Sequence, residues 1–248
     1  FARERKQRLD DTLALSTAYR GTAMLLGDVV EADHRYTGLH SREVVELSLA
    51  VARDLKLDAT QQRNVEFGAL LHDIGKIHIP KEIINKPGKL DEAEWKLIRQ
   101  HTIDGERMLQ QVGGLLASVG RIVRASHERY DGDGYPDGLA GEAIPIEARI
   151  VSTCDAFSAM TTNRSYRSAM STSEALAELR RCAGSQFDPQ VVEAIDRVRR
   201  LTADLPTVSE THPSHSASAP HRRSHEAAPR AGSLTPASHA RKRSRLPA

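Results

Sequence analysis

The stretch LLHDIGKI, residues 70–77, decides how this sequence is interpreted. An apolar helical run ends here in His72 and Asp73, and Gly75 then lets the chain turn at the helix end. Imidazole nitrogens and carboxylate oxygens are good ligands for divalent metals, and one aspartate can bridge two ions with its two oxygens. The Lys76 ammonium follows within one turn, where it can meet phosphate charge. A His-Asp pair on its own is more often a surface or capping pair. Whether this pair binds metal therefore depends on the other potential ligands in the chain.

Hydrophobic periodicity predicts helices along most of the chain. Val44, Leu47, Val51 and Leu55 fall on one helical stripe. Further helices are expected over about 58–73, 91–108, 115–127, 146–160, 171–184 and from 188 onward. Their start and stop signals are Asp58 with Gln61, Asp91 with Glu94, Ser171 or Thr172, Gly184, and Asp188 before Pro189. No alternating strand pattern occurs, so the sequence predicts an all-α domain of roughly seven helices with one long glycine-rich loop over 131–141.

Composition favours one soluble domain with extensions. The chain has 248 residues, 39% hydrophobic and 27% charged. Its two cysteines, Cys154 and Cys182, form no CxxC pair, which fits a reducing, cytoplasmic setting without a zinc knuckle or disulfide framework. No apolar run approaches the roughly 18 residues of a membrane span. The chain begins at Phe1, and we expect residues 1–18 to be a charged helical linker that follows an upstream domain.

The two ends of the chain differ in charge. From Thr211 onward it carries seven Lys/Arg and one Glu, whereas the rest carries 28 basic and 32 acidic residues. A mildly acidic body argues against a nucleic acid polymer as partner. Residues 205–248 are rich in Ser, Ala, Pro, His and Arg, and we predict that they form a disordered basic tail.

Three further histidines and a second aspartate stand where metal ligands can converge. His40 shares the helical stripe of Val44 and is expected to point inward, and His127 closes a predicted helix before the glycine-rich loop. Asp155 lies in a strongly apolar helix, where a carboxylate is costly unless it is paired or metal-bound. His101 by itself is equally well explained as a core histidine with one partner. Together these side chains can meet in the core of a helical bundle.

Five stretches occur in the order and at the spacing of a known family, over roughly residues 19–199. They are GLHSREV (38–44), LLHDIGKI (70–77), KPGKL (86–90), SHERYDGDGYP (126–136) and NRSYR (163–167). They resemble the HD-GYP family of HD-superfamily phosphohydrolases. The resemblance implies an HD-type catalytic domain over 19–204 that hydrolyses cyclic di-GMP to the linear dinucleotide and possibly GMP. It also implies two divalent metal ions, with iron or manganese suited to such ligands.

The same resemblance assigns the ligands and the substrate contacts. One metal would be held by His40, His72, Asp73 and Asp155, and the other would share Asp73 and take His101 and His127. Lys76 and Asp73 would be the catalytic pair, with Lys76 offsetting phosphoryl charge. Contacts to the nucleotide would come from Arg164, Arg167, Lys86 and Tyr135. From the residues alone, Arg164 and Arg167 can also be surface arginines at the end of the Asp155 helix.

The resemblance implies partners as well. The loop that carries Gly134, Tyr135 and Pro136 is linked in the family to GGDEF-type cyclase domains. A sensor or receiver domain is expected upstream, and a homodimer through the amino-terminal helix is a further hypothesis.

The sequence departs from the family pattern at several positions. Ser126 stands where many relatives carry a first histidine before Glu128, so the second metal loses a ligand or takes a water. Tyr36 stands where relatives with three metals carry glutamate, and we therefore predict two metals. Thr102 and Ser165 replace prolines, and Ser158 replaces a frequent aspartate.

Three hypotheses follow from the motifs. The first is an active cyclic-dinucleotide phosphodiesterase. The second is a domain that binds a cyclic dinucleotide or a protein partner without turnover, which Ser126 favours. The third is a phosphohydrolase that acts on another nucleotide, which the His72-Asp73 pair alone would allow.

Overall fold

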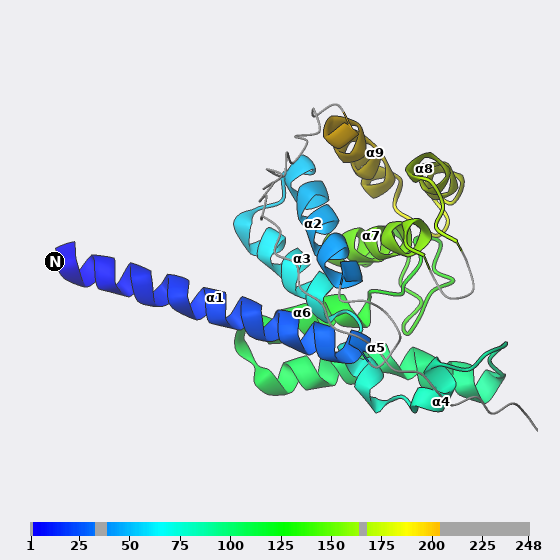
Figure 1. The fold of residues 1–248 in the computed structure, drawn as a ribbon, viewed down its shortest axis with the longest axis horizontal. Coiled ribbons are helices and arrows are strands. Elements are labelled where there is room, and N and C mark those ends of the chain that lie inside the picture. The colour runs from blue at the N-terminus through cyan, green and yellow to red at the C-terminus, as the bar shows by residue number, and fades with distance from the viewer. Residues whose placement is uncertain (1, 33–38, 164–167, 204–248) are drawn as a thin grey trace, which may run out of the picture. The chain divides into compact units, whose positions relative to one another are not determined.

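The computed structural model describes residues 2–32, 39–163 and 168–203, which form a helical protein (Figure 1). These ranges contain nine α-helices, two 3₁₀ helices and no β-strand. In chain order the elements are α1 (Ala2–Ala32), α2 (Leu39–Asp54), α3 (Ala59–Leu71), η1 (Ile74–His78), α4 (Lys81–Ile84), α5 (Glu92–Val112), α6 (Gly114–Arg124), η2 (Gly141–Ala143), α7 (Ile146–Thr161), α8 (Thr172–Arg181) and α9 (Pro189–Ala203). The all-α prediction is confirmed. The two helices beyond the seven expected are α1, which includes the helical segment expected over residues 1–18, and the single turn α4.

Capping side chains begin three helices where the sequence predicted a start, and the third is Ser171 with Glu174 ahead of α8. Asp58 accepts hydrogen bonds from the backbone N–H groups of Thr60 and Gln61 at 2.8 Å, and the Gln61 side chain accepts one from Asp58 in return. The same reciprocal arrangement joins Asp91 and Glu94 ahead of α5. Each box satisfies backbone donors that the first turn of a helix leaves free, which explains why these starts are readable from spacing.

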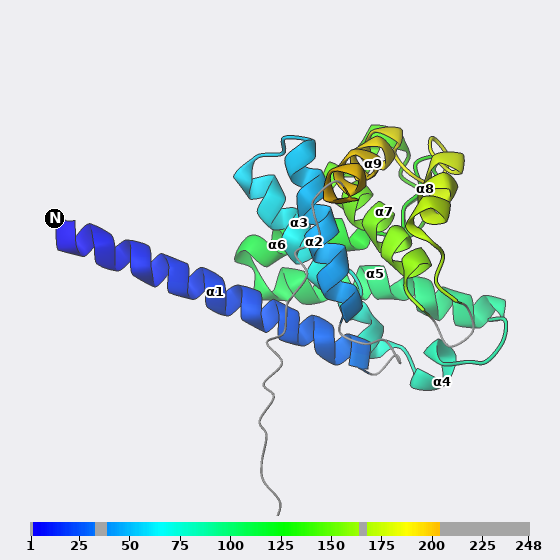
Figure 2. The same cartoon turned by 45° about the horizontal axis from the view of Figure 1, so that its top comes forward.

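Helices α2, α3 and α7 surround the main hydrophobic core (Figure 2). Three residues of the predicted stripe lie on α2 and are buried, since Val44 and Val51 are 0% exposed and Leu47 is 4% exposed. The fourth, Leu55, follows the helix and is partly buried. Val151 and Phe157 of α7 pack into the same core, to which α6, α8 and α9 also contribute. Burial of this apolar surface drives folding, and it fixes the positions of the ends of α3 and α7 relative to each other.

The 3₁₀ helix η1 lies against α5 at a distance that only glycine permits. A Cβ on Gly75 would lie 1.9 Å from the carbonyl oxygen of His101 and 2.7 Å from the backbone nitrogen of Gly105. Backbone therefore packs directly on backbone, which brings the end of α3 beside His101. Gly75 does not have a positive φ, so glycine is required here by the close approach of two elements and not by a turn conformation.

A buried carboxylate holds the glycine-rich loop after α6. Glu128 is 4% exposed and accepts hydrogen bonds from the backbone N–H groups of Asp137 and Leu139 at 2.7 and 3.1 Å. A Cβ on Gly134 would lie 2.3 Å from the backbone nitrogen of Arg129, so glycine is needed where the loop folds back. These two features fix the path of the loop over the end of α6.

Three predicted helix ends were too late in the sequence, since α8 ends at Arg181 rather than at Gly184 and the other two bear on the site. Helix α3 ends at Leu71 rather than at about Asp73, and α6 ends at Arg124 rather than at His127. Both Asp73 and His127 therefore lie in turns that follow their helices, where a side chain is freed from helical geometry.

The predicted domain boundaries stay predictions. Helix α1 runs without a break across the boundary expected between residues 18 and 19. The predicted tail, residues 205–248, lies outside the described residues. None of the helices in the described ranges is long and apolar enough to cross a lipid bilayer.

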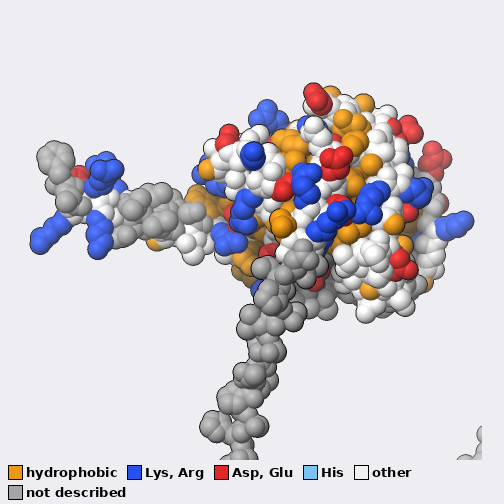
Figure 3. Space-filling model, turned by 90° about the horizontal axis from the view of Figure 1, so that it is seen from above, with side chains coloured by type: hydrophobic (Ala, Val, Ile, Leu, Met, Phe, Trp, Pro, Cys, Tyr) orange, Lys and Arg blue, Asp and Glu red, His pale blue; other side chains and the backbone are white. Residues whose placement is uncertain are grey.

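Charged side chains are interspersed on the face drawn in Figure 3, where basic and acidic groups lie next to each other. Ion pairs join α9 to its neighbours, with Arg197 Nη2 2.7 Å from Asp54 Oδ2 and Arg180 Nη2 2.5 Å from Asp196 Oδ1. Around α9 these charges therefore act in local pairs.

Candidate metal centre

Asp73 lies at the centre of the candidate site, in the turn between α3 and η1. On one side, its Oδ1 is 3.5 Å from His101 Nε2 and 3.9 Å from His127 Nε2. These three atoms are buried and have no hydrogen-bond partner in the described part of the chain, and all lie within 4.8 Å of one another. Buried polar atoms without partners are costly, and a cation bound between them would satisfy all three. The donor set therefore fits a metal ion.

The other oxygen of Asp73 faces a second group of side chains. Oδ2 is 3.5 Å from His72 Nε2, which in turn is 3.9 Å from Asp155 Oδ1. Lys76 donates a hydrogen bond of 2.5 Å to the same Oδ2. The side chains of Asp73, Asp155 and Lys76 are each about a quarter exposed, so the group is open to a ligand from solvent.

The backbone orients two of the histidines. His72 Nδ1 is 2.9 Å from the carbonyl oxygen of Ala69, and His101 Nδ1 is 2.5 Å from that of Ile98. Because a carbonyl can only accept, the single proton of the neutral ring lies on Nδ1, which leaves the Nε2 lone pair for a metal ion. Both lone pairs point toward Asp73, in the way that protein carbonyls commonly orient metal-binding histidines.

The electrostatics favour ligand-competent protonation states. Burial raises the pKa of the Asp73 carboxyl, but the charges of Lys76 and the surrounding histidines outweigh it and hold that pKa well below its usual value. Burial also lowers the pKa of His101 to about 4, against the opposing effect of Asp73. Asp73 is thus a carboxylate and His101 a neutral imidazole at neutral pH, as metal ligation requires.

The structure therefore brings together five predicted site residues from four segments: His72, Asp73, His101, His127 and Asp155. The sixth predicted ligand, His40, lies in the first turn of α2, but its side chain is outside the described part of the structure. The predicted nucleotide contacts Arg164 and Arg167, together with Ser165 and Tyr36, also lie outside them.

Lys86, a predicted nucleotide contact, has a protein partner in the structure. Its Nζ donates hydrogen bonds of 2.7 and 2.6 Å to the two carboxylate oxygens of Glu94 near the start of α5. This pair ties the segment before α5 to that helix. The contact between Lys86 and a nucleotide stays a prediction.

At three positions where the sequence departs from the family pattern, the side chain forms a hydrogen bond within the protein. Ser126 is 1% exposed and donates to the carbonyl oxygen of Val123 at 2.8 Å, so its hydroxyl serves the end of α6. Thr102 is buried and donates to the carbonyl oxygen of Arg99. Ser158 donates to Glu43 at 3.2 Å, which links α7 to α2.

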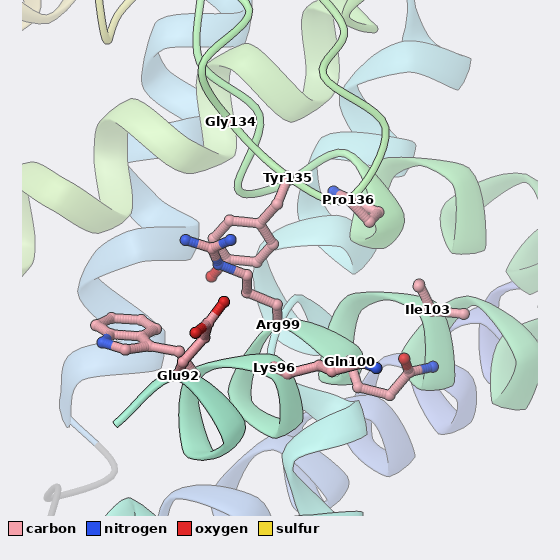
Figure 4. Close-up of a pocket in the computed structure, with 9 residues that line it drawn as sticks. Glu92, Lys96, Arg99, Gln100, Ile103, Gly134, Tyr135 and Pro136 are labelled. Atoms are coloured by element: carbon pink, nitrogen blue, oxygen red, sulfur yellow. The ribbon is translucent and has the colours of Figure 1, made fainter. Parts of the chain in front are cut away.

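Tyr135 connects this centre to a neighbouring pocket (Figure 4). Its backbone N–H donates to the carbonyl oxygen of His127, and its ring stacks on the His127 imidazole with centroids 5.2 Å apart. The pocket beyond it has a volume of about 740 Å³. Sequence reasoning missed its helical wall, which is formed by Glu92, Trp95, Lys96, Arg99, Gln100 and Ile103. The available signal was the recurrence of these residues on one face of α5.

Comparison with known proteins establishes the family. A family model described as HD domain matches residues 25–191. The chain therefore belongs to the HD domain family, and the resemblance to its HD-GYP members is confirmed.

Curated relatives share up to about two fifths of their residues with this chain over the matched region. The chain is 41% identical over 176 residues to a 3′3′-cGAMP-specific phosphodiesterase of Vibrio cholerae, covering 71% of this chain and 41% of that protein. It is 39% identical over 186 residues to a cyclic di-GMP phosphodiesterase of Pseudomonas aeruginosa, covering 75% and 45%. It is 40% identical over 181 residues to a cyclic di-GMP phosphodiesterase response regulator of Xanthomonas campestris, covering 73% and 48%. The chain thus spans less than half the length of these three relatives.

Two solved structures share the fold. One is an HDG"Y"P protein from Bdellovibrio bacteriovorus, with a TM-score of 0.53 at 24% identity over 65% of this chain and 51% of that one. The other is a cyclic GMP-AMP specific phosphodiesterase of Vibrio cholerae, with a TM-score of 0.56 at 19% identity over 72% and 48%. At these identities the likeness shows the fold alone, and it confirms the expected HD-type bundle.

Proposed function

We propose that this chain is the catalytic domain of a metal-dependent phosphodiesterase that hydrolyses a cyclic dinucleotide. Cyclic di-GMP is the first candidate substrate, with the linear dinucleotide as the first product and GMP as the product of a further hydrolysis. The observation that carries the proposal is the buried group of Asp73, His101 and His127, whose ligand atoms converge without partners. The phosphodiesterase names of the relatives support it.

The two oxygens of Asp73 support a site for two divalent ions, iron or manganese. In the proposed arrangement one ion takes His101, His127 and Asp73, and the other shares Asp73 and takes His72, Asp155 and His40. Two such ions stabilise the attacking and leaving oxygens of an in-line displacement at phosphorus.

Side chains of the chain itself complete the proposed site. Lys76 lies where its ammonium can balance charge on a phosphoryl oxygen, while it also holds Asp73 in place. Tyr135 forms the border between the metal centre and the pocket, in a position to contact the nucleotide. Arg164 and Arg167 are proposed contacts to phosphate or base.

The proposed location and partners of the protein follow from the resemblance to the HD-GYP family. We expect a cytoplasmic protein with an upstream sensor or receiver domain, and GGDEF-type cyclase domains and a second copy of the chain as possible partners. No nucleic acid polymer is proposed as a ligand.

One observation favours a non-hydrolysing receptor as the second candidate. The Ser126 hydroxyl is engaged by Val123 and does not join the metal group, so the His127 side of the site has one imidazole fewer than in many relatives. A weaker second ion would slow turnover and leave binding intact. Hydrolysis of a different nucleotide is the third candidate. No feature of the described residues favours it over the first two.

Product analysis tests the proposal directly. Purified protein is loaded with manganese or ferrous iron and incubated with cyclic di-GMP, 3′3′-cGAMP and linear pGpG, with chelator-treated protein as control. The proposal predicts that at least one cyclic dinucleotide is converted to its linear form, and only when metal is present. Tight binding of ligand without any product would support the receptor instead. Turnover confined to pGpG would support the third candidate.

A further inference from the structure

The pocket beside the metal centre has a helical wall and a loop wall. Glu92, Trp95, Lys96 and Arg99 recur along α5 at spacings of three and four residues, so they share one face of the helix. The loop wall includes Tyr135. Figure 4 shows Arg99 and Glu92 extending from α5 toward the side of the pocket that Tyr135 covers.

A stack of flat side chains leads from the metal centre into this pocket. The Tyr135 ring stacks on the His127 imidazole with an interplanar angle of 20°, and His127 Nε2 is 3.9 Å from Asp73 Oδ1. The Arg99 guanidinium carbon lies 5.5 Å from the Tyr135 ring centroid and 5.9 Å from that of Trp95. A flat group bound in the pocket would therefore extend the stack and stay next to the metal ligands.

Three charged side chains of the pocket keep their hydrogen-bonding groups available to a ligand, although the Gln100 amide donates to Asp104 at 3.4 Å. Glu92, Lys96 and Arg99 make no hydrogen bond or ion pair through their side chains within the described part of the chain. Their neighbours on α5 do, since Glu94 pairs with Lys86. Trp95 is 45% exposed, which is unusual for a large aromatic ring. An exposed ring surrounded by unpaired charges of both signs is suited to a flat ligand that carries donors and acceptors at its edge.

We propose that this pocket binds a guanine base of the cyclic dinucleotide, an inference that rests on the proposed function. The indole of Trp95 offers a face on which a base can stack. A guanidinium such as that of Arg99 can donate two hydrogen bonds to O6 and N7, which are both acceptors in guanine. The Glu92 carboxylate can accept hydrogen bonds from the ring N–H and the amino group on the opposite edge of guanine.

Adenine does not match the same pair of charges. It carries an amino donor where guanine has the O6 acceptor, which leaves Arg99 with a single acceptor at N7. It also has an unprotonated ring nitrogen where guanine has an N–H, and this lone pair would face the Glu92 carboxylate. The pocket therefore selects cyclic dinucleotides that contain at least one guanine, such as cyclic di-GMP and cyclic GMP-AMP, over cyclic di-AMP.

The chain contains one tryptophan, so its fluorescence reports on this pocket alone. Purified protein is titrated with GMP and with AMP, with excitation at the red edge of the indole band to avoid nucleotide absorption. Guanine stacking on Trp95 predicts saturable quenching by GMP, with an affinity at least about tenfold higher than for AMP. Absence of quenching, or equal affinities for the two nucleotides, would overturn the inference. Neither mononucleotide contains a diester bond, so this result is independent of whether the proposed hydrolysis occurs.

Two variants test the reading of the base edge. Glu92→Gln should lower the affinity for GMP and reduce the preference over AMP to less than about threefold, because the amide no longer distinguishes the two edges by charge. Arg107→Ala is the matched control, since Arg107 is an exposed arginine on the same helix that lies near Asp104 and away from the pocket. An unchanged preference in Glu92→Gln, or an equal loss in Arg107→Ala, would contradict the assignment.

Kinetics separate recognition from a structural role. Trp95→Ala should raise KM for a guanine-containing cyclic dinucleotide about tenfold, with kcat changed less than about threefold, and Trp95→Phe should restore most of the affinity. A fall in kcat at constant KM would mean that Trp95 acts on the structure of the metal centre, and the inference would fail.

Discussion

Helix α5 carries two faces that meet the same loop and differ in how they are held. On the buried face His101 is 1% exposed, and its bond to the carbonyl of Ile98 fixes the other ring nitrogen toward Asp73. On the exposed face Trp95 is 45% exposed, and Arg99 lies over two aromatic rings without an ion pair within the described residues. The side chains of the buried face are therefore fixed before a ligand binds, whereas those of the exposed face can change their conformation.

This difference matches the physical demands of two tasks. Metal ligands must be held within a fraction of an ångström, so their rotamers are locked by backbone hydrogen bonds and packing. Recognition of a base tolerates side-chain adjustment, because stacking and charged hydrogen bonds form over a broader range of positions. Substitutions on the buried face should therefore change metal content and kcat, whereas those on the exposed face should change KM.

The largest effect is expected at His101. His101→Ala removes one of three buried ligand atoms on the Oδ1 side of Asp73, so bound metal should fall and kcat should drop by at least about 100-fold. Elemental analysis of the purified protein and initial rates measure the two effects. His78→Ala is the matched control, because His78 is exposed in η1 and lies outside the metal group. Full metal content in His101→Ala would contradict the assignment of His101 as a metal ligand.

The close approach of η1 to α5 should be sensitive to a single methyl group. Gly75→Ala places a Cβ on the carbonyl oxygen of His101, so the two elements must separate and the free energy of unfolding should fall by about 1–3 kcal/mol. Thermal unfolding with and without metal measures the loss. Gly21→Ala, where a Cβ meets nothing within 4 Å, should instead stabilise α1 by about 0.5–1 kcal/mol. Equal effects of both substitutions would contradict the packing argument.

The glycine-rich loop should loosen when its buried carboxylate is removed. Glu128→Ala leaves the backbone donors of Asp137 and Leu139 without their acceptor, which should cost about 1–3 kcal/mol of stability. Tyr135 belongs to this loop and lines the pocket, so KM should rise as well. Urea unfolding and steady-state kinetics measure both, with Glu142→Ala, an exposed carboxylate near the same loop, as the comparison. A variant with unchanged stability would show that the loop is held by other contacts.

The smallest effect is expected at Lys86. Its partly exposed ion pair with Glu94 predicts that Lys86→Met costs less than about 1 kcal/mol. KM should also rise less than in Trp95→Ala, because the Lys86 ammonium is bound by the Glu94 carboxylate. A larger rise in KM than in Trp95→Ala would instead support the direct nucleotide contact implied by the family motif, and would move the recognition surface toward residues 86–90.

Much of the fold was readable from local patterns in the sequence. The capping boxes at Asp58 and Asp91 mark true helix starts, because their geometry depends only on residues three positions apart. The stripe that begins with Val44 is buried because helical periodicity alone places it on one face. The proposed ligands were assigned through the family resemblance, because they come from separate segments that no local pattern joins.

The parts that could not be predicted depend on contacts between distant segments. The position of His127 in a turn beyond α6 follows from the way the loop folds back at Gly134, which no local pattern encodes. The role of Gly75 depends on the backbone of His101, which lies in a different helix. The helical wall of the pocket was not predicted, because Trp95 was interpreted only as part of the helix that follows Asp91. In the structure Trp95 is 45% exposed and lines the pocket together with Tyr135 of the glycine-rich loop.

Hydrolysis of cyclic di-GMP by the manganese- or iron-loaded protein, beside the isosteric Asp73→Asn variant, tests the central claim most directly. The account predicts metal-dependent formation of the linear dinucleotide by the unmodified protein. It also predicts loss of both turnover and bound metal in the variant, because Asp73 is the residue that both halves of the site share. Undiminished turnover in Asp73→Asn, or metal-loaded protein that binds the ligand and leaves it intact, would contradict it.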